Sequence, residues 1–180
     1  MDNPFRVGVW DIECSSLRSN TGVIISSDIK LVGGGHITRV NKNLGGKNGL
    51  DDKELCIQIK KDLESLNMVV SFFGLGYDLR FINSRLLYWG EQPVKKLLHV
   101  DVYRIARRYF ATTRRNLDTV AKTLGIVGKN HVDLELWLEA GVNGNKKAIG
   151  YIVEHNILDT EVTEKVFLRL APLIQSISIA

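Results

Sequence analysis

The chain carries two acidic residues close to its start, in the segment DIE at positions 11–13. Side chains two positions apart in a β-strand point to the same face, so Asp11 and Glu13 would present two carboxylates to one place. Like charges held close together repel each other, and a bound cation would remove that cost. The alternative is a strand that simply ends in solvent at Asp11.

A second motif, HNILD at 155–159, lies in a segment with helical character. Residues four apart on a helix share a face, so His155 would lie beside Asp159. This pairing could place a metal-binding carboxylate next to a general base. The alternative is a His–Asp pair on an exposed helix surface.

Two further acids follow strand-like segments. Asp78, in FFGLGYDLRFI, comes after a Gly-x-Gly turn and opens a helix, where a carboxylate could also serve only to stabilise the helix N-terminus. Asp101, in HVDVYRIARR, could be an additional acid of the site. It could equally be a structural carboxylate bonded to the backbone or to a neighbouring arginine.

The surrounding pattern predicts the elements that position these residues. The order is three strands, a helix, a strand, a helix, a strand and then helices, which is typical of one α/β domain with a mixed sheet over residues 1–180. The expected strands are 5–14, two within 22–40 joined around glycines 33–35, 67–74 and 97–105. The expected helices are 51–66, 77–90 (closed by Gly90), 116–126, 130–141 and 146–174.

The composition excludes several classes of protein. A hydrophobic content of 44% and a charged content of 24% are ordinary for a globular domain, and no apolar run is long enough to cross a bilayer, so we expect no membrane partner. The first six residues lack the pattern of a secretory signal, so we expect an intracellular location, cytoplasmic or nucleoid-associated. Cys14 and Cys56 form no metal-binding pair and are expected to be free buried thiols. Any metal would therefore be held by carboxylates, which favours Mg²⁺ or Mn²⁺.

Positive charge is concentrated in residues 93–129. Nine basic and two acidic residues give this segment a net charge of +7, whereas the whole chain carries +4. Such a segment could neutralise phosphates, or it could be a solvated helix face. We expect Tyr109 and Phe110 to be core residues and some of the arginines to bind nucleic acid. The candidate arginines are Arg104, Arg107, Arg108, Arg114 and Arg115.

The order of these motifs resembles the DEDD superfamily of 3′→5′ exonucleases. The resemblance rests on DIE, on Tyr77-Asp78 opening a helix, on HVD at 99–101, on LDTVAKTLGI followed by Lys129, on LWLEAG, and on HNILD. The likeness is greatest to the exonuclease domains of family B DNA polymerases and to stand-alone RNase H-like exonucleases. It implies an RNase H-like (DnaQ-like) fold: a mixed five-stranded sheet, three antiparallel strands then two parallel ones, flanked by helices.

The same resemblance implies roles for the acids. Two divalent cations, Mg²⁺ or Mn²⁺, would be held with Asp11 bridging both, with Glu13 and Asp159 on the side of the attacking water, and with Asp78 on the other side. His155 would take the proton of that water. Ile12, Cys14 and Tyr77, which adjoin the carboxylates, are further candidates for contact with nucleic acid.

The chain departs from the family pattern at two positions. His155 stands where one subgroup has a tyrosine, while the subgroup that uses histidine has it five residues before the last aspartate, a position occupied here by Glu154. Phe73 stands where family members often have asparagine.

The sequence thus predicts a 3′→5′ exonuclease that releases nucleoside 5′-monophosphates from single-stranded DNA or RNA, DNA being favoured. Its partners would be 3′ ends of single strands and a separate polymerase or repair protein. The sequence does not define the oligomeric state. The alternatives are a non-catalytic nucleic-acid-binding module and a structure-specific endonuclease on the same fold.

Overall fold

The computed structural model describes residues 5–46, 51–128, 133–174 and 178–179, and a mixed six-stranded sheet lies at its centre. The strands are β1 (Val7–Cys14), β2 (Ile24–Leu31), β3 (His36–Val40), β4 (Met68–Ser71), β5 (Leu98–Asp101) and β6 (Ser178–Ile179), in the order β3-β2-β1-β4-β5-β6. β2 runs antiparallel to both of its neighbours, β1 and β3, whereas β4 is parallel to β1 and β5 is parallel to β4. The expected five-stranded RNase H-like arrangement is confirmed, and β6 adds a two-residue antiparallel edge.

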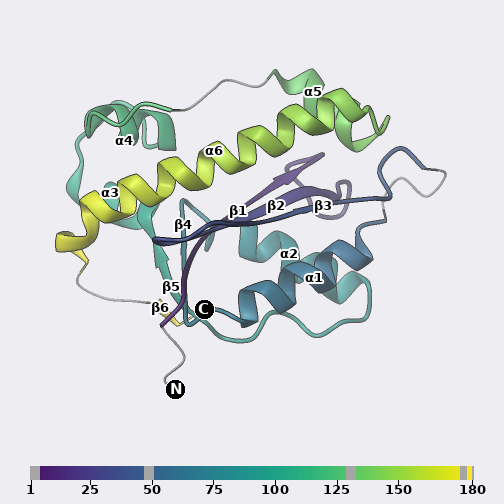
Figure 1. Cartoon of the computed structure of the whole chain (residues 1–180), viewed down its shortest axis with the longest axis horizontal. Coiled ribbons are helices and arrows are strands. Elements are labelled where there is room, and N and C mark those ends of the chain that lie inside the picture. Colours follow the sequence, from purple (N-terminus) through teal and green to yellow (C-terminus); the bar gives the residue numbers. More distant parts are fainter. Residues whose placement is uncertain (1–4, 47–50, 129–132, 175–177, 180) are drawn as a thin grey trace.

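Helices cover both faces of this sheet (Figure 1). One face carries α1 (Lys53–Glu64) and α2 (Asp78–Tyr88). The other face is crossed by the long helix α6, against which the remaining helices pack. These helices are α3 (Val102–Tyr109), α4 (Leu117–Thr123), α5 (Leu134–Gly141) and α6 (Lys146–Leu170). Within the described ranges, no helix has the length and hydrophobicity that crossing a membrane requires.

The alternation of side chains along β1 explains how one strand serves two layers. Trp10, Ile12 and Cys14 are buried in the apolar cluster formed with α1 and α2. The residues between them point to the opposite face because successive strand residues alternate, which places Asp11 and Glu13 on the α6 side. The hydrophobic residues of β1 thus fix the direction in which its two acids point.

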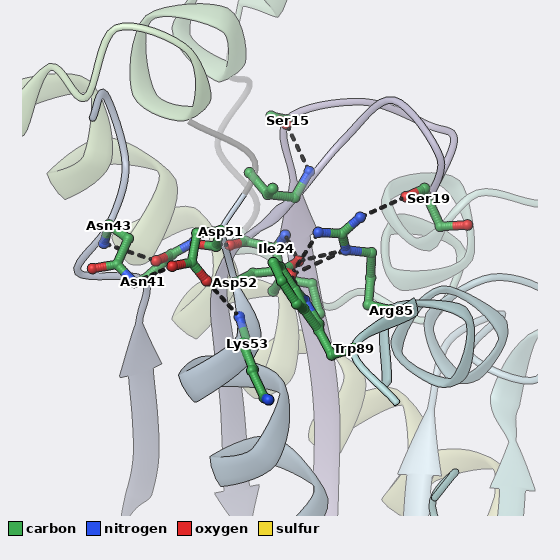
Figure 2. A network of polar contacts seen from close by, with 11 residues as sticks. Ser15, Ser19, Ile24, Asn41, Asn43, Asp51, Asp52, Lys53, Arg85 and Trp89 are labelled. Atoms are coloured by element: carbon green, nitrogen blue, oxygen red, sulfur yellow. Dashed lines mark hydrogen bonds and ion pairs between the residues drawn. The ribbon is translucent and has the colours of Figure 1, made fainter. Parts of the chain in front are cut away.

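A buried ion pair ties α2 to the N-terminus of α1 and to β2 (Figure 2). Arg85 of α2 donates from Nε and Nη2 to the carboxylate of Asp52, the residue before α1, and both side chains are almost completely buried. Asp52 also accepts from the indole N–H of Trp89 and from the backbone N–H of Ile24 in β2. Arg85 donates a further bond to the carbonyl of Ser19 in the loop after β1. The network therefore fixes α2, at whose first residue Asp78 lies.

The structure corrects the expected strand at 97–105. The strand ends at Asp101, and residues 102–109 form α3. Asp101 caps this helix by accepting from the N–H of Tyr103, and Val102 and Ala106 point into the core at helical spacing. The β-branched residues on both sides of Asp101 concealed this helix start in the sequence.

Other expectations are met with small shifts of boundary. Gly90 follows α2 with φ of +76°, the left-handed conformation expected of a residue that closes a helix. Cys14 and Cys56 are free and buried, as predicted. The last helix ends at Leu170 and is followed by a 3₁₀ turn, Ala171–Leu173. Lys129 and the first three residues of the helix expected at 130–141 lie outside the described residues.

Candidate active site

Carboxylates and a histidine from the two ends of the sequence meet where α6 crosses β1. Nε2 of His155 lies 3.8 Å from Oε1 of Glu13 and 3.8 Å from Oδ2 of Asp159. One potential ligand atom from each of these three residues lies within 4.8 Å of the other two. His155 and Asp159 are buried, so the group is shielded from solvent on the α6 side. A single divalent cation could contact all three residues.

Asp11 joins this group through a neighbour of His155. Oδ2 of Asp11 accepts a 2.7 Å hydrogen bond from the side-chain amide of Asn156, whose own oxygen accepts from the hydroxyl of Ser26 in β2. Asn156 is completely buried, so its orientation is fixed. It can therefore hold Asp11 in one position, as the hydrogen-bond partners of metal ligands do.

A cavity of about 460 Å³ opens beside Asp11 and Asp159. This volume is within the range of sites that bind small molecules or single nucleotides, roughly 300–1,000 Å³. Its wall combines the two acids with aromatic and polar side chains: Asp11, Phe72, Phe73, Tyr103, Arg115, Asn116, Leu117 and Asp159. The cavity thus connects the candidate metal ligands to a basic and an aromatic surface.

Asp78 reaches the site from the opposite layer, through the backbone of β1. β1 continues to Cys14 beyond its last pair with β4, Val9 with Val70, and the backbone N–H of Ile12 donates to Oδ1 of Asp78 at 3.3 Å. Asp78 is therefore anchored between the two acids of the DIE motif. Burial raises the pKa of Asp78 to about 7, and the negative charge of Asp101 contributes in the same direction. A cation bound at Asp78 would offset this cost of burying its charge.

Asp101 holds the turn that precedes Asp78. Its two carboxylate oxygens accept from the backbone N–H groups of Phe73, Leu75 and Tyr103. Burial raises its pKa, while these hydrogen bonds lower it. The contacts match the structural alternative considered for this acid, and they connect it to the site through the turn.

The imidazole of His99 and the thiol of Cys14 are poor candidates for proton transfer. Burial lowers the pKa of His99 to about 4, and Nε2 of its ring is 2.7 Å from the hydroxyl of Ser71. Burial, followed by the negative charge of Asp78, raises the pKa of Cys14 well above its usual range. Both groups are therefore neutral at pH 7.

Trp137 of α5 contacts both Glu13 and His155. Its indole N–H donates to Oε2 of Glu13 at 2.7 Å, and its ring meets the His155 ring edge-on with the centroids 5.8 Å apart. Neither Trp137 nor Asn156 was singled out from the sequence, although both lie in the quoted motifs LWLEAG and HNILD. Asn156 precedes Asp159 by three positions on the same helix face, and this spacing was the available signal.

The basic segment divides into two parts. Arg115 lines the cavity, whereas Arg104, Arg107 and Arg108 lie exposed along α3, and Arg114 is exposed in the segment after it. Phe110 packs against the apolar core as expected. The expectation for Tyr109 is wrong: it lies at the end of α3 with 38% of its surface exposed, beside the guanidinium of Arg108.

The three residues proposed beside the carboxylates are largely enclosed. Ile12 and Cys14 are buried in the core, so they could meet a nucleic-acid strand only through their backbone atoms. Tyr77 is partly buried, and its hydroxyl donates to the carbonyl of Ser16. Burial also raises the pKa of Tyr77 well above its usual range.

Comparisons with known proteins agree with the fold. The family model described as the RNase_H superfamily matches residues 9–171, a range that contains all the acids considered above. Over 143 residues the chain is 27% identical to the DNA polymerase III PolC-type of Ureaplasma parvum. That match covers 68% of this chain and 10% of the relative, so the chain spans about a tenth of the relative's length.

A solved structure shares the fold. The family B DNA polymerase of the hyperthermophilic archaeon Pyrobaculum calidifontis matches with a TM-score of 0.78 at 16% sequence identity. The match covers 94% of this chain and 25% of that polymerase. At this identity, the likeness concerns the arrangement of strands and helices.

Proposed function

Because the chain belongs to the RNase H superfamily, we propose that it is a metal-dependent 3′→5′ exonuclease. It would hydrolyse single-stranded nucleic acid, DNA in preference to RNA, to nucleoside 5′-monophosphates. The observation that carries the proposal is the meeting of Glu13, His155 and Asp159 beside Asp11, from segments about 140 positions apart in the chain. The likeness to DNA polymerases supports a nuclease activity.

The donor set suits hard divalent cations. Asp11, Glu13, Asp78 and Asp159 would hold two ions, and carboxylate oxygens are the ligands that Mg²⁺ and Mn²⁺ prefer. Burial raises the pKa of Asp78, and a cation beside this carboxylate would favour its charged form. When bound, the ions supply Lewis-acid stabilisation of the phosphate and lower the pKa of water.

Protein groups would supply the remaining parts of the reaction. We assign His155 as the base that takes the proton of the attacking water, since its Nε2 faces Glu13 and Asp159, whose charges would stabilise the imidazolium that forms. Trp137 and Asn156 would hold Glu13 and Asp11 in place. Arg115, at the cavity, would contact a phosphate of the strand.

The proposal is tested with single strands of DNA and RNA that carry a label in the 3′-terminal nucleotide. With Mg²⁺ or Mn²⁺, we expect release of labelled nucleoside 5′-monophosphate, which chelation stops. Asp11→Ala and Asp159→Ala should each lower the rate by at least about 100-fold, as expected for groups that stabilise transition-state charge. Unchanged rates in both variants would contradict the assignment of the site.

Two controls separate the alternatives. An endonuclease on this fold would open a circular single strand, whereas an exonuclease leaves the circle intact. A non-catalytic binding module would bind strands without binding divalent cations, which calorimetric titration with Mn²⁺ measures.

We also propose that the chain acts with a DNA polymerase, because the two relatives described above are DNA polymerases by name. Such a role requires a mismatched 3′ end to be shortened faster than a paired one. Equal rates on primer–template substrates with paired and mismatched ends would oppose it.

A further inference from the structure

Phe73 has an unusual backbone conformation at the edge of the cavity. Its φ is +68°, and among the described non-glycine residues it is the one with positive φ. A bulky side chain raises the free energy of this left-handed conformation, and such outliers are concentrated at functional sites. The turn between β4 and α2 therefore holds Phe73 in a conformation that its side chain does not favour.

Hydrogen bonds on both sides of Phe73 impose this conformation. Its N–H donates to Oδ1 of Asp101, and its carbonyl accepts from the N–H groups of Gly76 and Tyr77. The ring lies directly over Gly76, where an added Cβ would be 2.5 Å from a ring carbon. Tyr103 meets the ring edge-on, with the centroids 4.9 Å apart and the planes at 71°. The ring is therefore held in a defined position.

Packing in the core does not account for this placement. The neighbouring Phe72 packs against the apolar cluster below α3 and α6, whereas Phe73 lies outside the described apolar clusters and keeps 45% of its surface exposed. Phe73 and Tyr103 line the same cavity as Asp11 and Asp159, and Arg115 lines it with them. The exposed ring of Phe73, held in place, thus lies beside the candidate catalytic acids and beside the guanidinium group of Arg115.

We propose that Phe73, supported by Tyr103, forms a platform on which the base of a nucleotide at the strand end stacks. Every nucleobase has a flat π-face, so such a platform binds without selecting sequence. Arg115 would contact a phosphate of the same strand, while the scissile bond lies at Asp11 and Asp159. This inference rests on the proposed function and adds to it the means by which the site grips the terminal base.

The test compares the affinity of the protein for two single strands that differ only in the 3′-terminal residue. A 5′-fluorescent single strand ending in thymidine is compared with one ending in an abasic tetrahydrofuran residue, by anisotropy with Mg²⁺ in an Asp159→Asn background that keeps the ends intact. We expect Phe73→Asn to weaken binding of the thymidine end by about 5- to 150-fold and to leave binding of the abasic end nearly unchanged. Asparagine tolerates the left-handed conformation, so the variant should unfold at or above the temperature of its parent.

Tyr88→Asn is the matched control. Tyr88 is an exposed aromatic residue of α2 beside Arg85, outside the cavity lining, so its loss should not alter the ratio of the two affinities. A Phe73→Asn variant that retains the parent's preference for the thymidine end would overturn the platform. A variant that loses affinity equally for both ends, or that unfolds at a lower temperature, would assign Phe73 a structural role instead.

The outcome is separable from that of the proposed function. Strand binding by an unmutated protein that releases no nucleotide would refute the exonuclease and leave the stacking measurement valid. Failure of the unmutated protein to bind DNA or RNA ends at all would refute both.

Discussion

The four candidate metal ligands differ most in how they are buried. Asp11 and Glu13 are only partly buried, and both accept a 2.7 Å hydrogen bond from a neighbouring side chain, whereas Asp78 is buried and accepts from a backbone amide. Burial accordingly raises the pKa of Asp78 to about 7, above its ordinary value near 4. The metal-free protein should therefore be sensitive to pH at this residue.

The first prediction concerns Asp78 and pH. A carboxyl whose folded-state pKa is raised binds a proton in the folded state while the unfolded chain has already released it, so stability is lost as pH rises from about 4 through about 7. Asp78→Asn removes this loss and should raise the melting temperature of the metal-free protein at pH 8 by at least about 2 °C. The same variant should lose the stabilisation that Mn²⁺ gives the unmutated protein. Calorimetric scans at pH 8 with chelator and with Mn²⁺ measure both effects, and a lower metal-free melting temperature in the variant would contradict the account.

The second prediction separates a base from a ligand at His155. If His155 is the base, His155→Gln should lower the rate of nucleotide release by about 100-fold or more, while the affinity for Mn²⁺ changes little. Single-turnover rates and calorimetric titration give the two quantities. A large loss of Mn²⁺ affinity would instead make His155 a ligand, a position that its closeness to Glu13 and Asp159 also permits.

Residue-level prediction from sequence succeeded where spacing alone determines geometry. The strand period put Asp11 and Glu13 on one face, and the helix period put His155 beside Asp159, as the structure has them. Trp137 and Asn156 were missed because their roles depend on which buried side chain each one faces across the fold. The left-handed Phe73 could not be predicted from a phenylalanine, since the turn around it determines its conformation.

At the scale of elements, α5 and α2 position the site from opposite layers. α5 brings the indole of Trp137 to Glu13, and α2 brings Asp78 to the backbone of β1. A tryptophan in α5 and another directly after the last residue of α2 each donate to a carboxylate, Trp137 to Glu13 and Trp89 to Asp52. The two tryptophans therefore form a matched pair, one at the site and one away from it.

The third prediction uses that pair. Trp137→Phe keeps an aromatic ring, although a smaller one, and removes the indole N–H that donates to Glu13. Loss of such a contact to a metal ligand lowers metal affinity or activity by about 10- to 100-fold. Trp89→Phe removes the comparable bond to Asp52 and should lower the melting temperature without changing Mn²⁺ affinity. Equal effects of both variants on Mn²⁺ affinity would show that Trp137 does not act through Glu13.

The fourth prediction concerns the buried ion pair of α2. Arg85→Met leaves the buried carboxylate of Asp52 without its cation and should cost about 3–5 kcal/mol, which lowers the melting temperature by roughly 6–20 °C. Arg80→Met, on the exposed surface of the same helix, is the control and should have little effect. A similar melting temperature in both variants would mean that the network of Figure 2 does not hold α2 in place.

Element boundaries were the weaker part of the sequence prediction. The order and type of the strands and helices were recovered, but residues 102–105 were assigned to a strand although they begin α3. Val102, Tyr103 and Ile105 have strand propensity, and the cap formed by Asp101 together with packing against α6 outweighs it. β6 was missed because two residues at a sheet edge leave no periodic pattern.

At the scale of the whole molecule, the sheet brings together residues from the two ends of the sequence. β1 is a central strand and α6 crosses it, so the first and last acids meet although about 148 positions separate Asp11 from Asp159. The sequence predicted this meeting through resemblance to a known fold, since no local pattern fixes a contact between such distant residues. The cavity and its aromatic wall appeared only with the three-dimensional arrangement.

The lengths of the products distinguish stepwise cleavage at the 3′ end from cleavage inside the strand. A single strand labelled at its 5′ end is incubated with the protein and Mn²⁺, and the labelled products are resolved by length over time. We expect a ladder that shortens by single nucleotides from the 3′ end and is absent with chelator or with Asp11→Asn. Internal fragments in place of the ladder, or a strand that stays intact with Mn²⁺, would contradict this expectation.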